Sequence, residues 1–251
     1  MKEEKLAAER ERLALMREFE NKYGDEYTAI CGIDEAGRGP LAGPVVAGAV
    51  ILPRDCEILY LNDSKKLSEK RREALYDEIV EKAVAYSVGY ADHAAIDEIN
   101  ILQATYEAMR MAVNGLYSRD SGGRTSLQED QPDHVTDVTG HTAAHPATGE
   151  AGHSTGTHVA PDLLLNDAVV IPGITIKQVG IVHGDARSVS IAAASILAKV
   201  TRDRLMAVLD SLYPLYGFAK HKGYGTREHI EAIRKYGPCP IHRRTFITKF
   251  I

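Results

Sequence analysis

The sequence of 251 residues is poor in cysteine and has no long apolar run. Its three cysteines, Cys31, Cys56 and Cys239, are odd in number and none is spaced as a Cys-x-x-Cys pair, so neither a disulfide framework nor a zinc site is expected. No apolar stretch approaches the roughly 18 residues of a transmembrane helix, and no apolar segment follows the charged N-terminus as in a signal peptide. We therefore expect reduced thiols and a cytoplasmic protein.

An excess of positive charge is also absent. The chain has 30 Lys and Arg residues against 35 Asp and Glu residues, a net charge of −5, which excludes a uniformly basic nucleic-acid coat. The C-terminal segment 216–251 differs, because it has eight Lys or Arg residues and two Glu residues, a local charge of +6. This basic segment on an acidic body indicates either a polyanion partner held at one place or a solvated helix face.

Large apolar residues are almost absent from segment 119–160, which is rich in Gly, Ser, Thr, Asp and His. Such a segment cannot bury a core, so we expect a disordered insertion. Half of the ten histidines lie in it, namely His134, His141, His145, His153 and His158. They suit adventitious metal binding better than a catalytic cluster, because no apolar residues hold the rings in place.

The remaining sequence predicts an alternation of strands and helices. A charged helix with a narrow apolar stripe is expected over 1–24, either packed on the surface or frayed. Strands are predicted at 27–33, 45–52, 84–90, 163–171 and 176–182, and helices at 68–82, 96–116, 190–212 and about 227–236. Ser68 is the expected N-cap of the first of these helices. The small residues at the start of helix 190–212 permit close packing on a sheet. This order favours an α/β fold with a mixed sheet flanked by helices.

Segment 32–44 combines two acidic residues, an arginine and several glycines within a short stretch. Asp34 and Glu35 end an apolar run, Gly37-Arg38-Gly39 follows as a turn, and a second apolar run begins at residue 45. Carboxylates suit hard divalent cations, glycines let a ligand approach the backbone, and an arginine pairs with phosphate. A hairpin with exposed acids is the simpler alternative for an isolated Asp-Glu pair.

Two further acids lie within or directly after predicted strands. Asp167 interrupts the predicted strand 163–171, and Asp185 lies between the strand 176–182 and the helix 190–212. If they meet Asp34 and Glu35 at one side of the sheet, each pair repels by about 4 kcal/mol at 4 Å and an effective dielectric of about 20. Divalent metal ions would remove this repulsion and allow phosphoryl transfer by two metals. Taken singly, Asp167 and Asp185 also fit ordinary cap or turn residues.

Several blocks of the chain resemble type 2 ribonuclease H (ribonuclease HII). These blocks are Asp-Glu-Ala-Gly-Arg-Gly-Pro at 34–40, Asp-Ser-Lys-Lys-Leu at 63–67, Pro-Asp-Leu-Leu-Leu-Asn-Asp-Ala at 161–168, Gly-Asp-Ala-Arg-Ser at 184–188, 191–203, Lys-Gly-Tyr-Gly-Thr at 222–226 and 237–244. They are similar to the family's blocks and occur in the family's order. The resemblance covers about 27–116 and 161–246.

The resemblance implies a ribonuclease H-like fold, with an N-terminal helical extension over 1–26 and the type 2 domain over 27–251. This domain would include the insertion 119–160 and a basic C-terminal helical segment, 216–251. Asp34, Glu35, Asp167 and Asp185 match the family's catalytic acids, the first three being its main ligands for Mn²⁺ or Mg²⁺. Gly37, Arg38, Gly39 and Tyr224 match residues that read the ribose 2′-OH and the RNA-to-DNA junction. Ser64, Lys65 and Lys66, and also Arg243 and Arg244, are expected to hold the nucleic-acid backbone.

The expected activity is endonucleolytic hydrolysis of the RNA strand of RNA–DNA hybrids. It includes cleavage on the 5′ side of single ribonucleotides in duplex DNA, as in ribonucleotide excision repair, leaving 5′-phosphate and 3′-OH ends. We expect a monomer without a membrane partner. Lys199 and Asp203, four apart on one helix, are expected to form a structural pair. The alternatives are a non-catalytic hybrid-binding module and a ribonuclease HIII-like enzyme, which generally has another turn after Asp-Glu and an extra N-terminal domain.

Overall fold

The structure is a computed structural model and describes residues 2–118 and 157–251. The predicted insertion 119–160 lies outside the described residues except at its end. There, Val159 donates its backbone N–H to the carbonyl of Leu116 at 2.9 Å, and His158 pairs with Tyr117 in an isolated β-bridge. The two described parts of the chain are therefore joined by backbone hydrogen bonds close to where each begins or ends.

The centre of the fold is a six-stranded sheet with the order β4-β3-β2-β1-β5-β6. The strands are β1 (Ile30–Ala36), β2 (Val45–Ile51), β3 (Ala85–Ala91), β4 (Tyr117–Ser118), β5 (Leu163–Asp167) and β6 (Lys177–Ile181). Strands β1 to β4 are antiparallel neighbours, whereas β5 is parallel to both β1 and β6. The predicted mixed sheet is confirmed.

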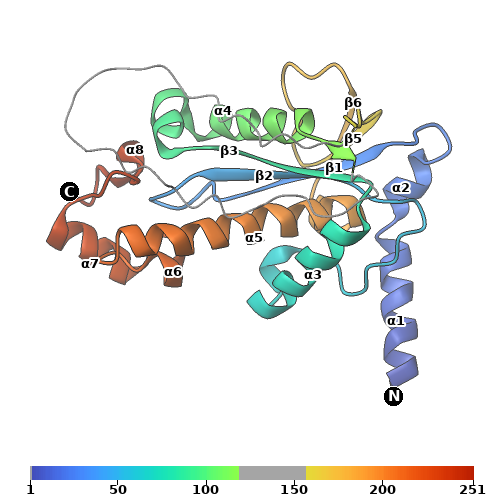
Figure 1. Ribbon diagram of the computed structural model, residues 1–251, viewed down its shortest axis with the longest axis horizontal. Helices are drawn as coiled ribbons and strands as arrows, with labels where there is room; N and C mark the ends of the chain where they lie inside the picture. The colour runs from blue at the N-terminus through green and yellow to red at the C-terminus, as the bar shows by residue number, and fades with distance from the viewer. Residues whose placement is uncertain (1, 119–156) are drawn as a thin grey trace.

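Helices cover both faces of this sheet (Figure 1). Helix α4 (His93–Asn114) packs on one face, and α5 (Val189–Leu212) packs on the other. Strand β2 shows how the sequence produces the two layers, because successive side chains point to opposite faces. Val45, Ala47 and Ala49 join the core under α4, whereas Val50 joins the core formed by α5 and α3 (Glu69–Lys82).

The small residues of α5 bring that helix unusually close to the sheet. Ala192, Ala193 and Ala194 are all fully buried. A Cβ atom built on Gly32 of β1 would lie 2.1 Å from the backbone carbon of Ser190, so no side chain fits at position 32. The expected close packing of this helix is confirmed, and it places the N-terminal end of α5 against the strand that bears Asp34.

The N-terminal helix is broken into two, α1 (Lys2–Leu15) and α2 (Glu18–Tyr23), where one helix over 1–24 was expected. Leu13 and Met16 are buried in the core that α5 and α3 form. The carbonyl of Met16 accepts a hydrogen bond from the N–H of Val189 at 3.1 Å. This contact with the first residue of α5 explains the break, and the segment is packed rather than frayed at these two residues.

The predicted C-terminal ends of strands β1 and β5 are wrong. Strand β1 starts at Ile30 and continues to Ala36, so Asp34 and Glu35 lie inside the strand rather than beyond it. Strand β5 stops at Asp167 instead of running to residue 171, because Ala168 adopts a left-handed conformation with φ of 57°. The Asn166 side chain stabilises this turn by donating to the carbonyl of Val169 at 3.2 Å.

The C-terminal part consists of short helices beyond the end of α5 (Figure 1). These helices are α6 (Phe218–His221), α7 (Arg227–Tyr236) and α8 (Arg244–Ile247). Helix α7 confirms the predicted range. Within residues 2–118 and 157–251, no helix combines the length and the apolar character that crossing a membrane requires.

Candidate active site

Three acids meet at one edge of the sheet because three neighbouring strands are parallel there. Ile33 of β1 pairs with Asn166 of β5, so the next residues along, Asp34 and Asp167, lie side by side. Strand β6 ends at the same edge, and the chain then turns through His183 into a short 3-10 helix, η2 (Gly184–Ala186), which contains Asp185. Carboxyl ends of parallel strands commonly form binding sites for this reason.

The three carboxylates form a compact oxygen cluster. One oxygen from each of Asp34, Asp167 and Asp185 lies within 4.8 Å of the others. Asp34 and Asp185 are buried, with 4% and 6% of their surfaces exposed. The N–H of Gly184 donates to Asp167 Oδ1 at 2.8 Å and fixes η2 against β5. Oxygen ligands at this spacing fit a hard divalent cation, and the structure brings together three of the four acids that the sequence analysis considered.

The electrostatics of the cluster favour an added positive charge. Burial is the main cause that raises the pKa of Asp34 well above its usual value, and Glu35 and Asp167 raise it further. The pKa of Asp185 is raised by burial and by the negative charges of Asp63 and Asp167. Buried like charges of this kind are costly unless a cation compensates them.

Lys65 is the cation that the protein itself places near these acids. It belongs to the short 3-10 helix η1 (Ser64–Lys66), whose first turn is capped by the Asp63 side chain. Burial alone would lower the pKa of the Lys65 ammonium, but the nearby carboxylates, beginning with Asp34 and Asp63, outweigh it and raise the pKa. Lys65 therefore stays charged while its side chain is exposed to solvent.

Glu35 lies outside the cluster of three. Neighbouring residues of a strand point to opposite faces, so Glu35 and Asp34 diverge. The Glu35 carboxylate accepts a hydrogen bond from Arg38 at 3.3 Å. Burial raises the pKa of Glu35, although the guanidinium of Arg38 opposes this shift. Asp167 raises it as well, which places Glu35 within electrostatic reach of the cluster.

The Gly37-Arg38-Gly39 turn lies against Tyr224. A Cβ atom on Gly39 would lie 3.8 Å from Cε1 of Tyr224. Tyr224 is 44% exposed, and the side chain of Arg38 is 45% exposed. Two segments far apart in the sequence therefore present an aromatic ring, an arginine and bare backbone together. This arrangement was expected from the motifs.

Arg243 holds that turn from inside the protein and has no access to a ligand. Its side chain is fully buried, and its guanidinium donates to the carbonyls of Gly37 at 2.6 Å, Arg38 at 2.9 Å and Gly43 at 2.9 Å. The expectation that Arg243 contacts a nucleic-acid backbone is wrong. Burial and, to a smaller extent, the charge of Arg202 together lower the pKa of Arg243 to about 9.

Arg202, which the sequence analysis missed, has a similar role on the other side of the turn. It is fully buried on α5, and a Cβ on Gly37 would lie 2.0 Å from its Nε. Its guanidinium donates to the carbonyl oxygens of Pro44, Ala42 and Lys222. Its position four residues after Ala198 and four before Met206, both buried, is a sequence signal that could have revealed a charged residue on an apolar helix stripe.

Ser64 is buried instead of facing solvent. Its hydroxyl lies 2.8 Å from the hydroxyl of Ser195 on α5. Ser195 also donates to the Asp34 carboxylate, which lowers the pKa of that acid against the stronger effect of burial. A chain of hydroxyl groups therefore connects η1 to the acid cluster, and Ser195 is a residue that the motif analysis missed.

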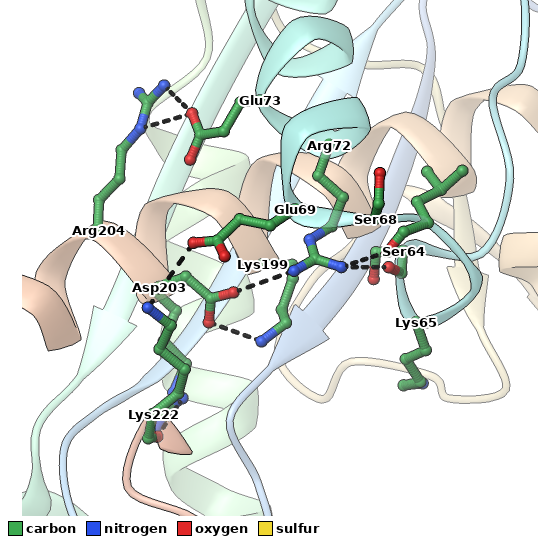
Figure 2. Close-up of polar contacts among 12 residues, drawn as sticks. Ser64, Lys65, Ser68, Glu69, Arg72, Glu73, Lys199, Asp203, Arg204 and Lys222 are labelled. Carbon is green, nitrogen blue, oxygen red and sulfur yellow. Dashed lines mark hydrogen bonds and ion pairs between the residues drawn. The ribbon is translucent and has the colours of Figure 1, made fainter. Parts of the chain in front are cut away.

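Arg72 links η1 to helix α5, as Figure 2 shows. Its guanidinium donates to the carbonyls of Ser64 at 3.1 Å and Leu67 at 2.6 Å, and it lies 3.5 Å from the carboxylate of Asp203. Lys199 Nζ contacts the same carboxylate at 2.6 Å. The expected structural pair of Lys199 and Asp203 is confirmed, and it belongs to a network that fixes the loop bearing Lys65.

Comparisons with known proteins agree with this geometry. The family model described as ribonuclease HII matches residues 31–143 and 165–249. The chain is 55% identical over 244 residues to the ribonuclease HII of Lachnoclostridium phytofermentans, covering 97% of this chain and 80% of that protein. It is 51% identical over 229 residues to that of Acetivibrio thermocellus, covering 91% and 73%.

A solved structure shows the same fold. The ribonuclease H2 from Pyrococcus horikoshii superposes with a TM-score of 0.60 at 25% identity, covering 89% of this chain and 97% of that chain. The expected ribonuclease H-like architecture is confirmed.

Proposed function

Since the chain belongs to the ribonuclease HII family of hydrolases, we propose that it cuts the RNA strand of RNA–DNA hybrids and cuts 5′ of single ribonucleotides in duplex DNA. The observation that carries the proposal is the cluster of Asp34, Asp167 and Asp185 at the edge of the sheet. The products are a 5′-phosphate end and a 3′-OH end.

The acid cluster is proposed to hold two divalent cations, Mg²⁺ or Mn²⁺. Such ions lower the pKa of a bound water and stabilise charge on the phosphorus centre and the leaving oxygen. Asp34, Asp167 and Asp185 supply oxygen ligands, and Glu35 adds a ligand when its pairing with Arg38 is released. This proposal is supported by the raised pKa of Asp34, for which burial and neighbouring acids are responsible.

The turn at Gly37, Arg38 and Gly39 is proposed to recognise the ribonucleotide together with Tyr224. The exposed ring of Tyr224 offers a stacking face for a sugar or base, and Gly39 beside it has no side chain to keep a 2′-OH away. Lys65 is proposed to hold a phosphate next to the acids. Together these groups select where the cut falls.

The test is cleavage of a DNA duplex containing one ribonucleotide, with Mg²⁺ or Mn²⁺, followed by analysis of the product ends. Asp34→Asn and Asp167→Asn should reduce cleavage by at least about 100-fold, since each removes a charged metal ligand. Asp55→Asn, a matched change at an exposed acid in a loop, should leave the rate unchanged. Metal-independent cleavage, or a 2′,3′-cyclic phosphate product, would contradict the proposal.

A further inference from the structure

Three buried histidines lie behind Tyr224, and nothing in the proposed chemistry uses them. His221 ends α6, His229 belongs to α7, and His242 precedes α8. His229 and His242 are fully buried. Burial lowers the pKa of His229 and of His242 to about 4, so both rings are neutral near pH 7. Neutral imidazoles each have one donor and one acceptor, which makes the direction of their hydrogen bonds assignable.

The hydrogen bonds of His242 determine which of its ring nitrogens carries the proton. The N–H of Cys239 points at His242 Nδ1 at 2.9 Å, so this nitrogen must offer a lone pair. The carbonyl of Cys239 is farther from the same nitrogen, at 3.2 Å. The proton of His242 is therefore on Nε2, which lies 3.0 Å from Nε2 of His229.

His229 accepts a hydrogen bond from His242 and donates one to the backbone of Tyr224. Because its Nε2 accepts from His242, its own proton is on Nδ1, which lies 2.9 Å from the carbonyl oxygen of Tyr224. The chain of donors thus runs from Cys239 through His242 and His229 to the backbone of Tyr224. The His221 ring stacks on His229 with centroids 4.5 Å apart and holds that ring in place.

The turn before Tyr224 needs this support. Lys222 and Gly223 both have positive φ, 52° and 83°, and a non-glycine residue in that region is strained. The N–H of Gly223 donates to His221 Nδ1 at 3.2 Å, and the N–H of Tyr224 donates to the His221 carbonyl at 2.9 Å. Histidines therefore contact both sides of the peptide units that aim the Tyr224 ring at Gly39.

We propose that His229 and His242 are positioning residues that fix the Tyr224 backbone so that its ring meets the substrate beside Gly39. The inference rests on the proposed role of Tyr224 in reading the ribonucleotide. Neither histidine touches the substrate, because both are buried. Their effect on cleavage therefore passes only through Tyr224.

Two variants of His229 separate positioning from packing. In His229→Asn the side-chain amide nitrogen replaces Nδ1 and still reaches the Tyr224 carbonyl. In His229→Gln the amide replaces Nε2, which keeps the contact with His242 but loses the one with Tyr224. On a duplex with one ribonucleotide, we expect His229→Gln to lower kcat/KM by about tenfold and His229→Asn by less than about threefold.

A double-mutant cycle with Tyr224→Ala tests whether the effect passes through Tyr224. The loss from His229→Gln should disappear in the Tyr224→Ala background, because no ring remains to be aimed. If the same tenfold loss persists there, or if the Asn and Gln variants of His229 are equally impaired, the positioning role is overturned. If Tyr224→Ala alone cleaves normally, the proposed reading role of Tyr224 fails, and the positioning role fails with it. Circular dichroism and thermal melting confirm that each variant is folded.

Discussion

At the scale of single residues, position in the sheet matters more than residue type. Asp34, Asp167 and Asp185 were predictable because each follows or breaks an apolar run, and their strands end at one edge. The role of Arg243 was not predictable, because an arginine in a basic segment is normally on the surface. Its burial is explained by the three carbonyl acceptors around it, which come from segment 37–43 and lie 200 to 206 residues away in the sequence.

The raised pKa of Asp34 predicts a destabilising charge in the metal-free protein. An acid whose pKa is raised on folding destabilises the folded state above that pKa, and the penalty is relieved as the pH falls towards the unfolded value of 3.8. Asp34→Asn should therefore raise the Tm at pH 7 without metal, by about 3 °C. Thermal melting from pH 7 to pH 4 checks this, because the gain should shrink on acidification. The control Asp55→Asn should show no gain at any pH, and a fall in Tm for Asp34→Asn at pH 7 would contradict the prediction.

The buried guanidinium of Arg243 predicts a second measurable effect. Arg243→Lys keeps the charge but cannot reach the three carbonyls that the planar group serves, leaving at least one buried acceptor unpaired. We expect a loss of about 3 kcal/mol in the free energy of unfolding, measured by urea denaturation. The neighbouring change Arg244→Lys, at an exposed position, is the matched control and should change stability by less than about 0.5 kcal/mol. Equal stability of the two variants would refute the structural role of Arg243.

At the scale of elements, amphipathic patterns identified most helices and strands but missed their interruptions. Helix α4 confirms a helix where 96–116 was predicted, yet it begins at His93 and is kinked at Asn100. Asn100 has φ of 69°, and its side-chain oxygen accepts from the N–H groups of Leu102 at 3.0 Å and Gln103 at 3.2 Å. The residue acts as a cap for the second half of the helix, which apolar spacing alone does not reveal.

The kink at Asn100 makes a prediction about stability. Asn100→Ala removes the cap and leaves a β-carbon at a positive φ of 69° without the side-chain hydrogen bonds that offset its strain, so it should lower the free energy of unfolding by about 2 kcal/mol. Asn100→Gly removes the same cap but tolerates the positive φ, and should lose clearly less. Urea denaturation of both variants measures the difference. If alanine were tolerated as well as glycine, the backbone conformation at Asn100 would not be a constraint.

At the scale of the whole molecule, the order of strands and the family blocks were enough to predict an α/β fold with a mixed sheet. The contacts that the sequence could not reveal are those between distant segments. The contacts of Arg72 with Asp203 and of Arg243 with Gly37 depend on how α3, α5 and the C-terminal segment pack, and no local pattern encodes these pairings. Motifs therefore predict part of the site, whereas the residues that hold the site in place are evident only from the fold.

The acid cluster also predicts that divalent cations stabilise the whole molecule. A ligand that binds only the folded state raises the free energy of unfolding by RT ln(1 + [L]/Kd), about 2.7 kcal/mol at 100 times Kd. We expect the Tm to rise with Mn²⁺ or Mg²⁺ concentration in the unmodified protein and to rise much less in Asp34→Asn. Differential scanning fluorimetry, in buffer from which divalent cations have been removed before the additions, measures the Tm of both proteins. NaCl of equal ionic strength is the control. An equal rise in both proteins would mean that the ions bind elsewhere.

The central position of β1 has a consequence during synthesis of the chain. Its partner β2 is made directly after it, but its other partner, β5, begins at Leu163, 127 residues after β1 ends at Ala36. Until the ribosome has produced β5, the backbone edge of Ile30–Ala36 has no strand beside it, and an apolar open edge invites pairing with other chains. A nascent or truncated chain that stops before β5 is therefore expected to depend on chaperones to stay free of aggregates, and it cannot yet bring Asp34, Asp167 and Asp185 together.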